Sequence, residues 1–454
     1  MLCERPCVTP PNSAARKRLR PDKRARPLAT TALTGGQPPP IMPAVELNVA
    51  LALAIFAFTY FVLAVGNFPG LKLDRTGAAL VGALAMVLSG TLGKRAAFDA
   101  IDFPTLLLLF GMMIVVANLR LSGAFELAAR WLLARARSGF GLLAMTVLIS
   151  GLLAAFFIND VVCLALAPPL IELSRLLEMD AAPLLLALAT ASNIGSVATL
   201  TGNPQNMIVA GFAHLGYAAF AARLAPVAIV GLIVDYAVIA WLYRCPLRRI
   251  RRSAALTPPR PAQTRHWALI KSALVAVAVL AGFALGYSTW LVAMAGGAAL
   301  LFTRRTPPES VYGLVDWTLL VMFAGLFVVV AGAETTGVQN DLLRMAGPGR
   351  LHQPGALAAL VAILSNLVSN VPAVMLFRPI YAQLDHGGAA GLILASASTL
   401  AGNLTLLGSI ANLIVVEQAR REGITISFVD YLRVGLPVTL VTLVLDVVWL
   451  RLLG

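Results

Sequence analysis

The chain has little charge and few cysteines or histidines. Only 12% of its 454 residues are Asp, Glu, Lys or Arg, whereas 59% are hydrophobic and the mean hydropathy is +0.84. Soluble domains of this length need a more polar surface, so the composition indicates a polytopic membrane protein. The four Cys and four His residues lack the spacing of a disulfide framework or metal site. No nucleophile is paired with a base either, so we expect neither an enzyme nor a protein with a metal or cofactor.

The basic residues, which give a net charge of +14, lie in short clusters between apolar runs. This distribution is typical of cytoplasmic loops and argues against nucleic-acid binding. Residues 1–41 are basic but have no apolar segment behind them, so they form neither a signal peptide nor a packed domain. We expect a disordered basic tail, or a start codon assigned too far upstream, because Met42 precedes the first apolar run.

Apolar runs long enough to cross a bilayer, which takes about 20 residues, recur along the rest of the chain. They predict ten crossings, near 47–66, 76–93, 103–119, 183–212 (interrupted), 224–243, 267–285, 287–303, 317–333, 389–416 (interrupted) and 430–450. Two further apolar stretches, 140–177 and 355–384, are each split by a polar tip. Each is either a pair of full helices or a re-entrant hairpin, and in both cases the chain returns to the side it left.

The sequence contains two copies of one unit. LATASNIGSVATLTGNPQNMIV (188–209) aligns without gaps to LASASTLAGNLTLLGSIANLIV (394–415), and the flanking segments nearly keep this register. Each copy has five crossings, an odd number, so the second is inverted relative to the first, as in many secondary transporters. We therefore expect an all-α fold with membrane repeat 1 at 42–243, a basic linker at 244–265 and inverted membrane repeat 2 at 266–454.

The arginine-rich linker sets the expected orientation. The positive-inside rule places 244–265 in the cytoplasm. Counting crossings from there puts the N-terminus outside, which conflicts with a basic tail unless translation starts near Met42.

The two aligned segments are too polar for uninterrupted membrane helices. Pro204 lacks a backbone donor and disfavours helical geometry at Asn203, so repeat 1 should break near 201–206. Repeat 2 has glycines but no proline, which predicts a milder break. Such breaks expose carbonyls and amides that can bind ions or solute; the alternative is a proline kink packed by polar side chains. We predict solute binding by Thr201, Asn203 and Ser409, and ion coupling by Gly202, Gly408, Asn206 and Asn412.

Each split stretch has polar residues where a helix begins. Asn159-Asp160 precede one helical run and Ser369-Asn370 precede the other. These residues are good N-caps, but two helix N-termini aimed at the membrane centre would also bind an anion. We predict that Asn159, Ser369 and Asn370 bind solute. Asp160 would repel an anion unless a cation or proton accompanies it, so it is either a cap or a coupling-ion residue.

Asp235 and Asp446 occupy equivalent places in the two copies. An acid within a membrane is a functional candidate, and we include both as ion-coupling residues. The alternative is that each is protonated and pairs within the scaffold.

The motifs FFINDVVCLALAPPLI, ASNIGSVATLTGNPQNMI, LVSNVPAVML and AGNLTLLGSIANLIV together resemble the ion transporter superfamily. This group includes citrate-transporter-like permeases, divalent-anion:sodium symporters, arsenite efflux permeases and NhaD-type sodium/proton antiporters. The resemblance covers about residues 45–454. It implies re-entrant hairpins whose tips face discontinuous helices, with solute and sodium between them, in a homodimer whose transport domain moves like an elevator.

Carried over to this chain, the resemblance places the hairpin tips at Asn159-Asp160 and Ser369-Asn370 and the helix breaks at 201–203 and 408–409. The dicarboxylate symporters have Ser-Asn-Thr at both tips, which this chain lacks. Its Asn-Asp tip is more similar to the arsenite-permease and NhaD-like branches, and TGNPQN to the anion-permease branch.

The sequence therefore predicts a secondary transporter of a small anion or oxyanion in the bacterial cytoplasmic (inner) membrane, coupled to Na⁺ or H⁺. We expect the lipid bilayer, the solute and a second copy of the chain as its partners. The alternatives are a Na⁺/H⁺ antiporter or an arsenite-type efflux permease.

Overall fold

The computed structural model describes residues 42–66, 72–135, 138–248, 266–303, 306–337, 347, 351–384 and 389–453. Residues 44–454 form one compact unit, and the account below concerns that unit. The basic stretch 1–41 lies outside the described residues. So does most of the linker, of which only Arg244–Arg248 is described.

Every regular element in the described segments is a helix, as the composition predicts. The first half contains α1 (Met42–Val65), α2 (Arg75–Leu88), α3 (Lys94–Ala100), α4 (Phe103–Leu121), α5 (Ala124–Arg135), α6 (Gly139–Phe156), α7 (Asn159–Leu176), α8 (Ala182–Ser196), η1 (Leu200–Gly202), α9 (Pro204–Ala213), α10 (Tyr217–Leu242) and α11 (Arg244–Arg248). The second half contains α12 (His266–Ala284), α13 (Thr289–Leu301), α14 (Pro308–Tyr312), α15 (Trp317–Glu334), α18 (Pro354–Val368), α19 (Asn370–Met375), η2 (Arg378–Ile380), α20 (Tyr381–Leu384), α21 (Ala389–Ala401), η3 (Leu406–Gly408), α22 (Ile410–Arg421) and α23 (Phe428–Leu453).

Within the described residues, seven helices are long and apolar enough to cross a membrane: α1, α4, α6, α10, α12, α15 and α23. The predicted spans that contain α2 and α13 form shorter helices of 14 and 13 residues. The two interrupted spans are broken into α8-η1-α9 and α21-η3-α22. A search for long apolar runs did not reveal the short helices α3, α5 and α14.

The two breaks have the same backbone form. Each begins with an extended residue, Thr199 (φ −140°, ψ 166°) or Thr405 (φ −129°, ψ 159°), and ends with another, Asn203 (φ −155°, ψ 160°) or Ser409 (φ −144°, ψ 143°). The prediction of a milder break in repeat 2 was therefore wrong. Proline is not required, because side-chain amides satisfy the freed backbone groups in both copies, as described below.

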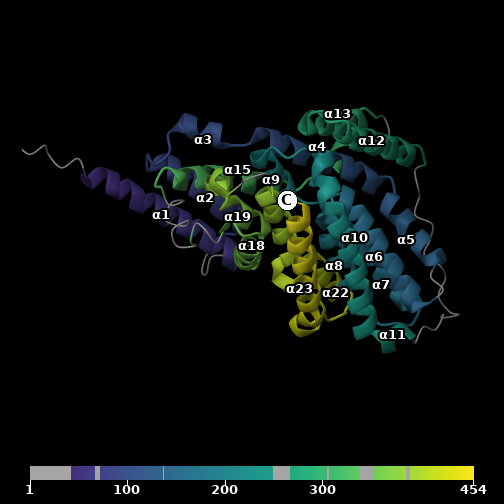
Figure 1. The fold of residues 1–454 in the computed structure, drawn as a ribbon. Helices are drawn as coiled ribbons and strands as arrows, with labels where there is room; N and C mark the ends of the chain where they lie inside the picture. The colour runs from purple at the N-terminus through teal and green to yellow at the C-terminus, as the bar shows by residue number, and fades with distance from the viewer. Residues whose placement is uncertain are drawn as a thin grey trace, which may run out of the picture. The chain divides into compact units, whose positions relative to one another are not determined.

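The two copies pack in equivalent ways around the centre of the unit (Figure 1). Helix α2 packs against α15, α13 packs against α4, and α10 lies beside α23. These are reciprocal contacts, since each pairs an element of one copy with an element of the other. The fold is thus a pair of inverted repeats, as the sequence predicts.

The two re-entrant hairpins, hairpin 1 (α6–α7) and hairpin 2 (α18–α19), connect the copies crosswise. The first helix of each hairpin packs against the broken helix of its own copy, α6 on α8 and α18 on α21. The second helix packs on the broken helix of the other copy, α7 on α22 and α19 on α9. This arrangement brings both hairpin tips to the interface between the repeats, where Asn159 is 3% and Asn370 7% exposed.

Candidate solute site

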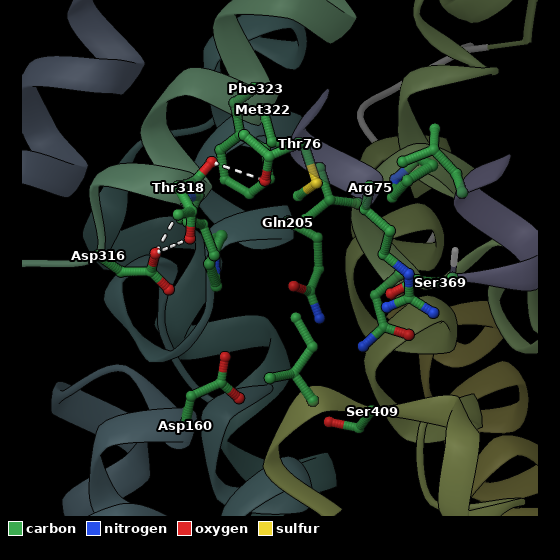
Figure 2. Close-up of a pocket in the computed structure, with 18 of the residues that line it drawn as sticks. Arg75, Thr76, Asp160, Gln205, Asp316, Thr318, Met322, Phe323, Ser369 and Ser409 are labelled. Atoms are coloured by element: carbon green, nitrogen blue, oxygen red, sulfur yellow. Dashed lines mark hydrogen bonds between the residues drawn. The ribbon is translucent and has the colours of Figure 1, made fainter. Parts of the chain in front are cut away.

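A cavity of about 260 Å³ lies where the hairpin tips meet the broken helices (Figure 2). Its walls come from α1, α2, both hairpins, both broken helices and α15. The lining residues are Leu63, Gly66, Asp74, Arg75, Thr76, Asn159, Asp160, Pro204, Gln205, Asp316, Thr318, Leu319, Met322, Phe323, Ser369, Asn370, Val371, Pro372, Ser409 and Ile410.

Several helices start at this cavity. Asn159 is the first residue of α7, Asn370 is the first of α19, and Ser409 precedes α22. Helix N-termini carry unpaired amides and partial positive charge, so they favour negative groups nearby. The Asp160 carboxylate uses this directly, since it is hydrogen-bonded by the backbone amide of Ala411 in α22. An acid of repeat 1 is thus held by the broken helix of repeat 2.

Asn193, in α8, joins the two repeats behind the cavity. It is fully buried, and its side-chain oxygen accepts from Asn159 Nδ2 (2.8 Å) and Ser409 Oγ (3.1 Å). Its nitrogen donates to the side-chain oxygens of Asn403 (2.8 Å) and Asn412 (3.0 Å). Asn193 was not among the site residues predicted from the sequence. Its position about two turns before the predicted break at 201–206 was the available signal.

Gln205 and Thr399 make the equivalent connection at the second tip. The Asn370 amide is satisfied when its nitrogen donates to the carbonyls of Ser398 and Gly408, both at 3.1 Å. Its oxygen then accepts from Gln205 Nε2 at 3.1 Å. Gln205 also donates to Thr399 Oγ1, again at 3.1 Å. Hairpin 2, which belongs to the second copy, is therefore held by the broken helix of the first copy.

Asn206 and Asn412 have the same structural task in the two copies. Asn206 Nδ2 donates to the carbonyls of Ser196 (3.0 Å) and Thr199 (2.9 Å). Asn412 Nδ2 donates to Gly402 (2.8 Å) and Thr405 (3.1 Å), which are the aligned positions. These bonds satisfy carbonyls that the broken helices leave without partners. Both residues lie outside the cavity lining, although they were predicted as ion-coupling residues.

Thr201 and Asn203, which were predicted to bind solute, also face the protein. Thr201 Oγ1 lies 3.2 Å from Thr199 Oγ1 and 3.4 Å from Tyr217 Oη. Asn203 Nδ2 donates to Ser196 Oγ at 2.9 Å and to Thr399 Oγ1 at 3.1 Å.

Gly202 and Gly408 allow close backbone approach at the breaks. A Cβ on Gly202 would lie 2.2 Å from the Ser196 carbonyl oxygen, and one on Gly408 would lie 2.8 Å from that of Gly402. Of the thirteen predicted residues, those that line the cavity are Asn159, Asp160, Ser369, Asn370 and Ser409.

Asp235 and Asp446 lie away from the cavity, in equivalent helix contacts. Asp446 on α23 accepts a hydrogen bond from Ser396 Oγ at 2.7 Å, and Asp235 on α10 lies beside the side chain of Thr190, whose hydroxyl donates to Leu186 O. Thr190 and Ser396 occupy aligned positions of the repeat. Both acids are fully buried, and Asp446 Oδ1 and both carboxyl oxygens of Asp235 have no hydrogen-bond partner among the described residues.

Three charged residues in the cavity wall, Asp74, Arg75 and Asp316, were not predicted from the sequence. Asp316 caps α15, accepting from Leu319 N (3.0 Å) and Thr318 Oγ1 (2.5 Å), and Arg75 is the first residue of α2. Asp316 has a sequence signal, because an Asp precedes the apolar run 317–333. Arg75 stands at the edge of a span and has no local signal.

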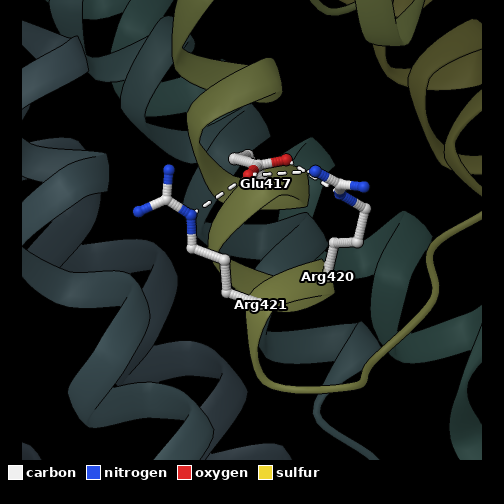
Figure 3. Close-up of polar contacts among 3 residues, drawn as sticks. All are labelled: Glu417, Arg420 and Arg421. Atoms are coloured by element: carbon white, nitrogen blue, oxygen red, sulfur yellow. Dashed lines mark hydrogen bonds and ion pairs between the residues drawn. The ribbon is translucent and has the colours of Figure 1, made fainter.

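An ion-pair cluster ends α22 on the side expected to be cytoplasmic (Figure 3). Glu417 accepts from Arg420 Nε at 2.9 Å and from Arg421 Nε at 3.0 Å. These hydrogen bonds lower the pKa of Glu417 from its ordinary value of 4.5. Because all three side chains are at least 39% exposed, the cluster contributes little to stability.

Comparison with known proteins shows that this chain is similar to transporters. The family model described as citrate transporter matches residues 51–392. An uncharacterized transporter of Mycobacterium tuberculosis is 32% identical over 423 residues, which cover 88% of this chain and 99% of that protein. The silicon efflux transporter LSI3 of Oryza sativa subsp. japonica is 30% identical over 480 residues, covering 89% and 96%.

Two more distant proteins are also similar. The putative transporter arsB of Dictyostelium discoideum is 23% identical over 498 residues, covering 85% of this chain and 88% of that protein. Among solved structures, the YdaH transporter of Alcanivorax borkumensis aligns with a TM-score of 0.55 and 17% identity, over 90% of this chain and 97% of that one. This last likeness concerns the fold alone.

Proposed function

The chain belongs to the citrate transporter family, and from that premise we propose that it is a secondary active transporter of a small anion or oxyanion. Its place would be the bacterial cytoplasmic (inner) membrane. The observation that carries the proposal is the convergence of both hairpin tips and both broken helices on one polar cavity. The cavity's 260 Å³ is below the usual 300–1,000 Å³ of sites for drug-sized ligands, which favours a small solute over a lipid or peptide.

In this proposal the solute is bound by the amides and hydroxyls at the tips. Asn159, Asn370, Ser369 and Ser409 supply donors and acceptors, and Asp160 binds the coupling Na⁺ or proton. A cation at Asp160 offsets the solute's negative charge, so the pair crosses the low-dielectric interior at lower cost than either ion alone.

A second cavity supports alternating access. This cavity has a volume of about 640 Å³ and lies at the N-terminal end of α4. Its lining includes Asp102, which caps α4 as Asp316 caps α15. The tip residues line the first cavity and are absent from the second. With the linker in the cytoplasm, the first cavity opens inward. Movement of the hairpin-bearing unit, in an elevator-like step within a homodimer, would then transfer the tips to the opposite side.

The solute class follows from the relatives by analogy. One relative is named a silicon efflux transporter, another carries the name arsB, and the family model is named for citrate. Citrate is a carboxylic acid, and silicon dissolves in water as an oxyacid, so we propose an oxyacid or its anion as the solute, with arsenite-type efflux as the specific alternative.

A Na⁺/H⁺ antiporter is the second candidate function. The observation in its favour is that three carboxylates, Asp74, Asp160 and Asp316, line the cavity beside one basic side chain, Arg75. A wall of this charge favours a cation. In such a protein, Asp160 would bind Na⁺ and protons alternately, and no anion would cross.

Proteoliposome transport separates these proposals. Purified protein is reconstituted and offered labelled citrate, silicate or arsenite, with a Na⁺ or pH gradient imposed in turn. Gradient-driven movement of one of these solutes supports the oxyacid transporter. Proton flux on adding Na⁺, with none of the solutes present, supports the antiporter. The absence of both activities, with correct insertion verified, refutes the two candidates together. For variants of the tip asparagines, such as Asn159→Ala, the matched control is Asn118→Ala. Asn118 is buried in α4 and donates within its own helix to Ile114 O.

A further inference from the structure

Among the described residues that line the first cavity, Arg75 is the one basic side chain. It begins α2, next to the end of α1, where an ideal Cβ on Gly66 would lie 4.0 Å from Arg75 Nη2. Helix α1 is in turn joined to hairpin 2, since Tyr60 Oη donates to Pro372 O at 3.1 Å. Figure 2 shows Arg75 on the same wall as Ser369, with Asp160 and Asp316 on the opposite wall and Gln205 between them.

The guanidinium of Arg75 has unmet hydrogen-bonding capacity. No hydrogen bond or ion pair joins it to another described residue, and its Nε is buried without a partner. The neighbouring Asp74 does not serve as its partner, because the Asp74 side chain accepts from Gly77 N at 2.8 Å to cap α2. A charged donor left unpaired costs more than a neutral one. The site therefore lacks an acceptor beside Arg75.

The carboxylates of the cavity are in the opposite situation. Asp316 accepts from Leu319 N and Thr318 Oγ1, and Asp160 is held by the backbone amide of Ala411. Each acid thus already has a hydrogen-bond donor from a helix N-terminus. The unfilled requirement in the cavity is for an anionic acceptor next to Arg75, although the lining as a whole carries more acids than bases.

We propose that Arg75 is the anion-binding residue of this cavity. Its planar guanidinium binds two oxygens of a carboxylate or a tetrahedral oxyanion in bidentate fashion. Ser369, at the tip of hairpin 2, lies on the same wall of the cavity as Arg75. The coupling cation is held on the opposite wall, by Asp160. The inference rests on the proposed transport of an oxyanion and names the residue that selects it.

The test is a binding measurement on the purified full-length protein, separate from transport. Citrate, phosphate and sulfate are titrated calorimetrically into the wild type, Arg75→Gln, Arg75→Lys and Arg95→Gln. Arg95→Gln is the matched control, because its side chain is 96% exposed on α3 and outside the cavity. The ligand-free melting temperature of each variant is recorded as well, since a purely structural role would change that value and leave the dissociation constant unaltered.

We expect the wild type to bind at least one of the three anions. Arg75→Gln should raise its Kd by about 10- to 100-fold, which is the loss of charge-assisted hydrogen bonds. Arg75→Lys should raise it less, since an ammonium keeps the charge without the fork, and Arg95→Gln should leave it unchanged. Binding of none of the anions by the wild type, or an unchanged Kd in Arg75→Gln, overturns the inference. If Arg75→Gln fails to fold, Arg75→Lys decides, and an unchanged Kd there refutes bidentate binding.

Failure of the proposed function gives a different result. Arg75-dependent anion binding without movement of any solute in proteoliposomes would refute transport and leave the binding residue in place. Solute transport with the same KM in the wild type and Arg75→Gln would refute the role of Arg75 and leave transport in place.

Discussion

Replacing Asn193 by alanine should destabilise the fold more than any single local hydrogen bond accounts for. Its side chain makes four buried hydrogen bonds, to Asn159, Ser409, Asn403 and Asn412. At about 1 kcal/mol each in soluble proteins, or about 0.6 kcal/mol as measured between membrane helices, the four sum to about 2–4 kcal/mol. The loss also releases the tip of hairpin 1, so transport should fall with stability.

The matched comparison is Asn118→Ala, which removes the same side-chain atoms from a buried position but one hydrogen bond within α4. We expect about 1 kcal/mol or less for that variant. Both variants are unfolded by SDS in mixed micelles and followed by tryptophan fluorescence. Equal free energies of unfolding for the two variants would refute the view that Asn193 connects the repeats.

Three further outcomes are expected. Asn159→Ala and Asn370→Ala should each abolish uptake in proteoliposomes at normal expression, and normal uptake by both would contradict a role for the tips. Ser369, at φ +76°, should gain up to about 1 kcal/mol of stability as Ser369→Gly in the same SDS assay, because non-glycine residues are strained there; a loss would argue against that strain. Glu417→Gln should melt slightly below the wild type at pH 7, and the gap should close as the pH falls below about 4.5, since a carboxyl with a lowered pKa stabilises only while ionised; a gap independent of pH would exclude this ion pair as its cause.

The architecture could be predicted from the sequence because its signals are local or repeated. Pro204 and Gly202 mark a break by their own backbone chemistry, and the gapless alignment of 188–209 with 394–415 shows that the break is duplicated. The severity of the second break could not be predicted from proline content. It depends on Asn412 reaching the carbonyls of Gly402 and Thr405, a contact that exists only once the loop is folded.

The residues that line the cavity were harder to predict from the sequence. Polar residues of one motif point in different directions, because the backbone of the break is irregular and adjacent side chains leave it at different angles. Gln205 lines the cavity, whereas Asn203 and Asn206 face the protein and satisfy its polar groups. Polar side chains in a membrane segment can either form hydrogen bonds with free backbone groups or bind a ligand. The residue types alone do not show which of these two roles a given side chain has.

The sequence by itself determined the membrane class, the duplication, the inversion and the two places where membrane helices break, since each follows from composition, parity or the backbone chemistry of single residues. Tertiary structure alone decided which side chains share a cavity. Arg75, Asp316 and the two hairpin tips are distant in the chain, and their meeting depends on the crosswise packing of α7 on α22 and α19 on α9. Such contacts arise from shape complementarity between buried surfaces, which no local pattern encodes.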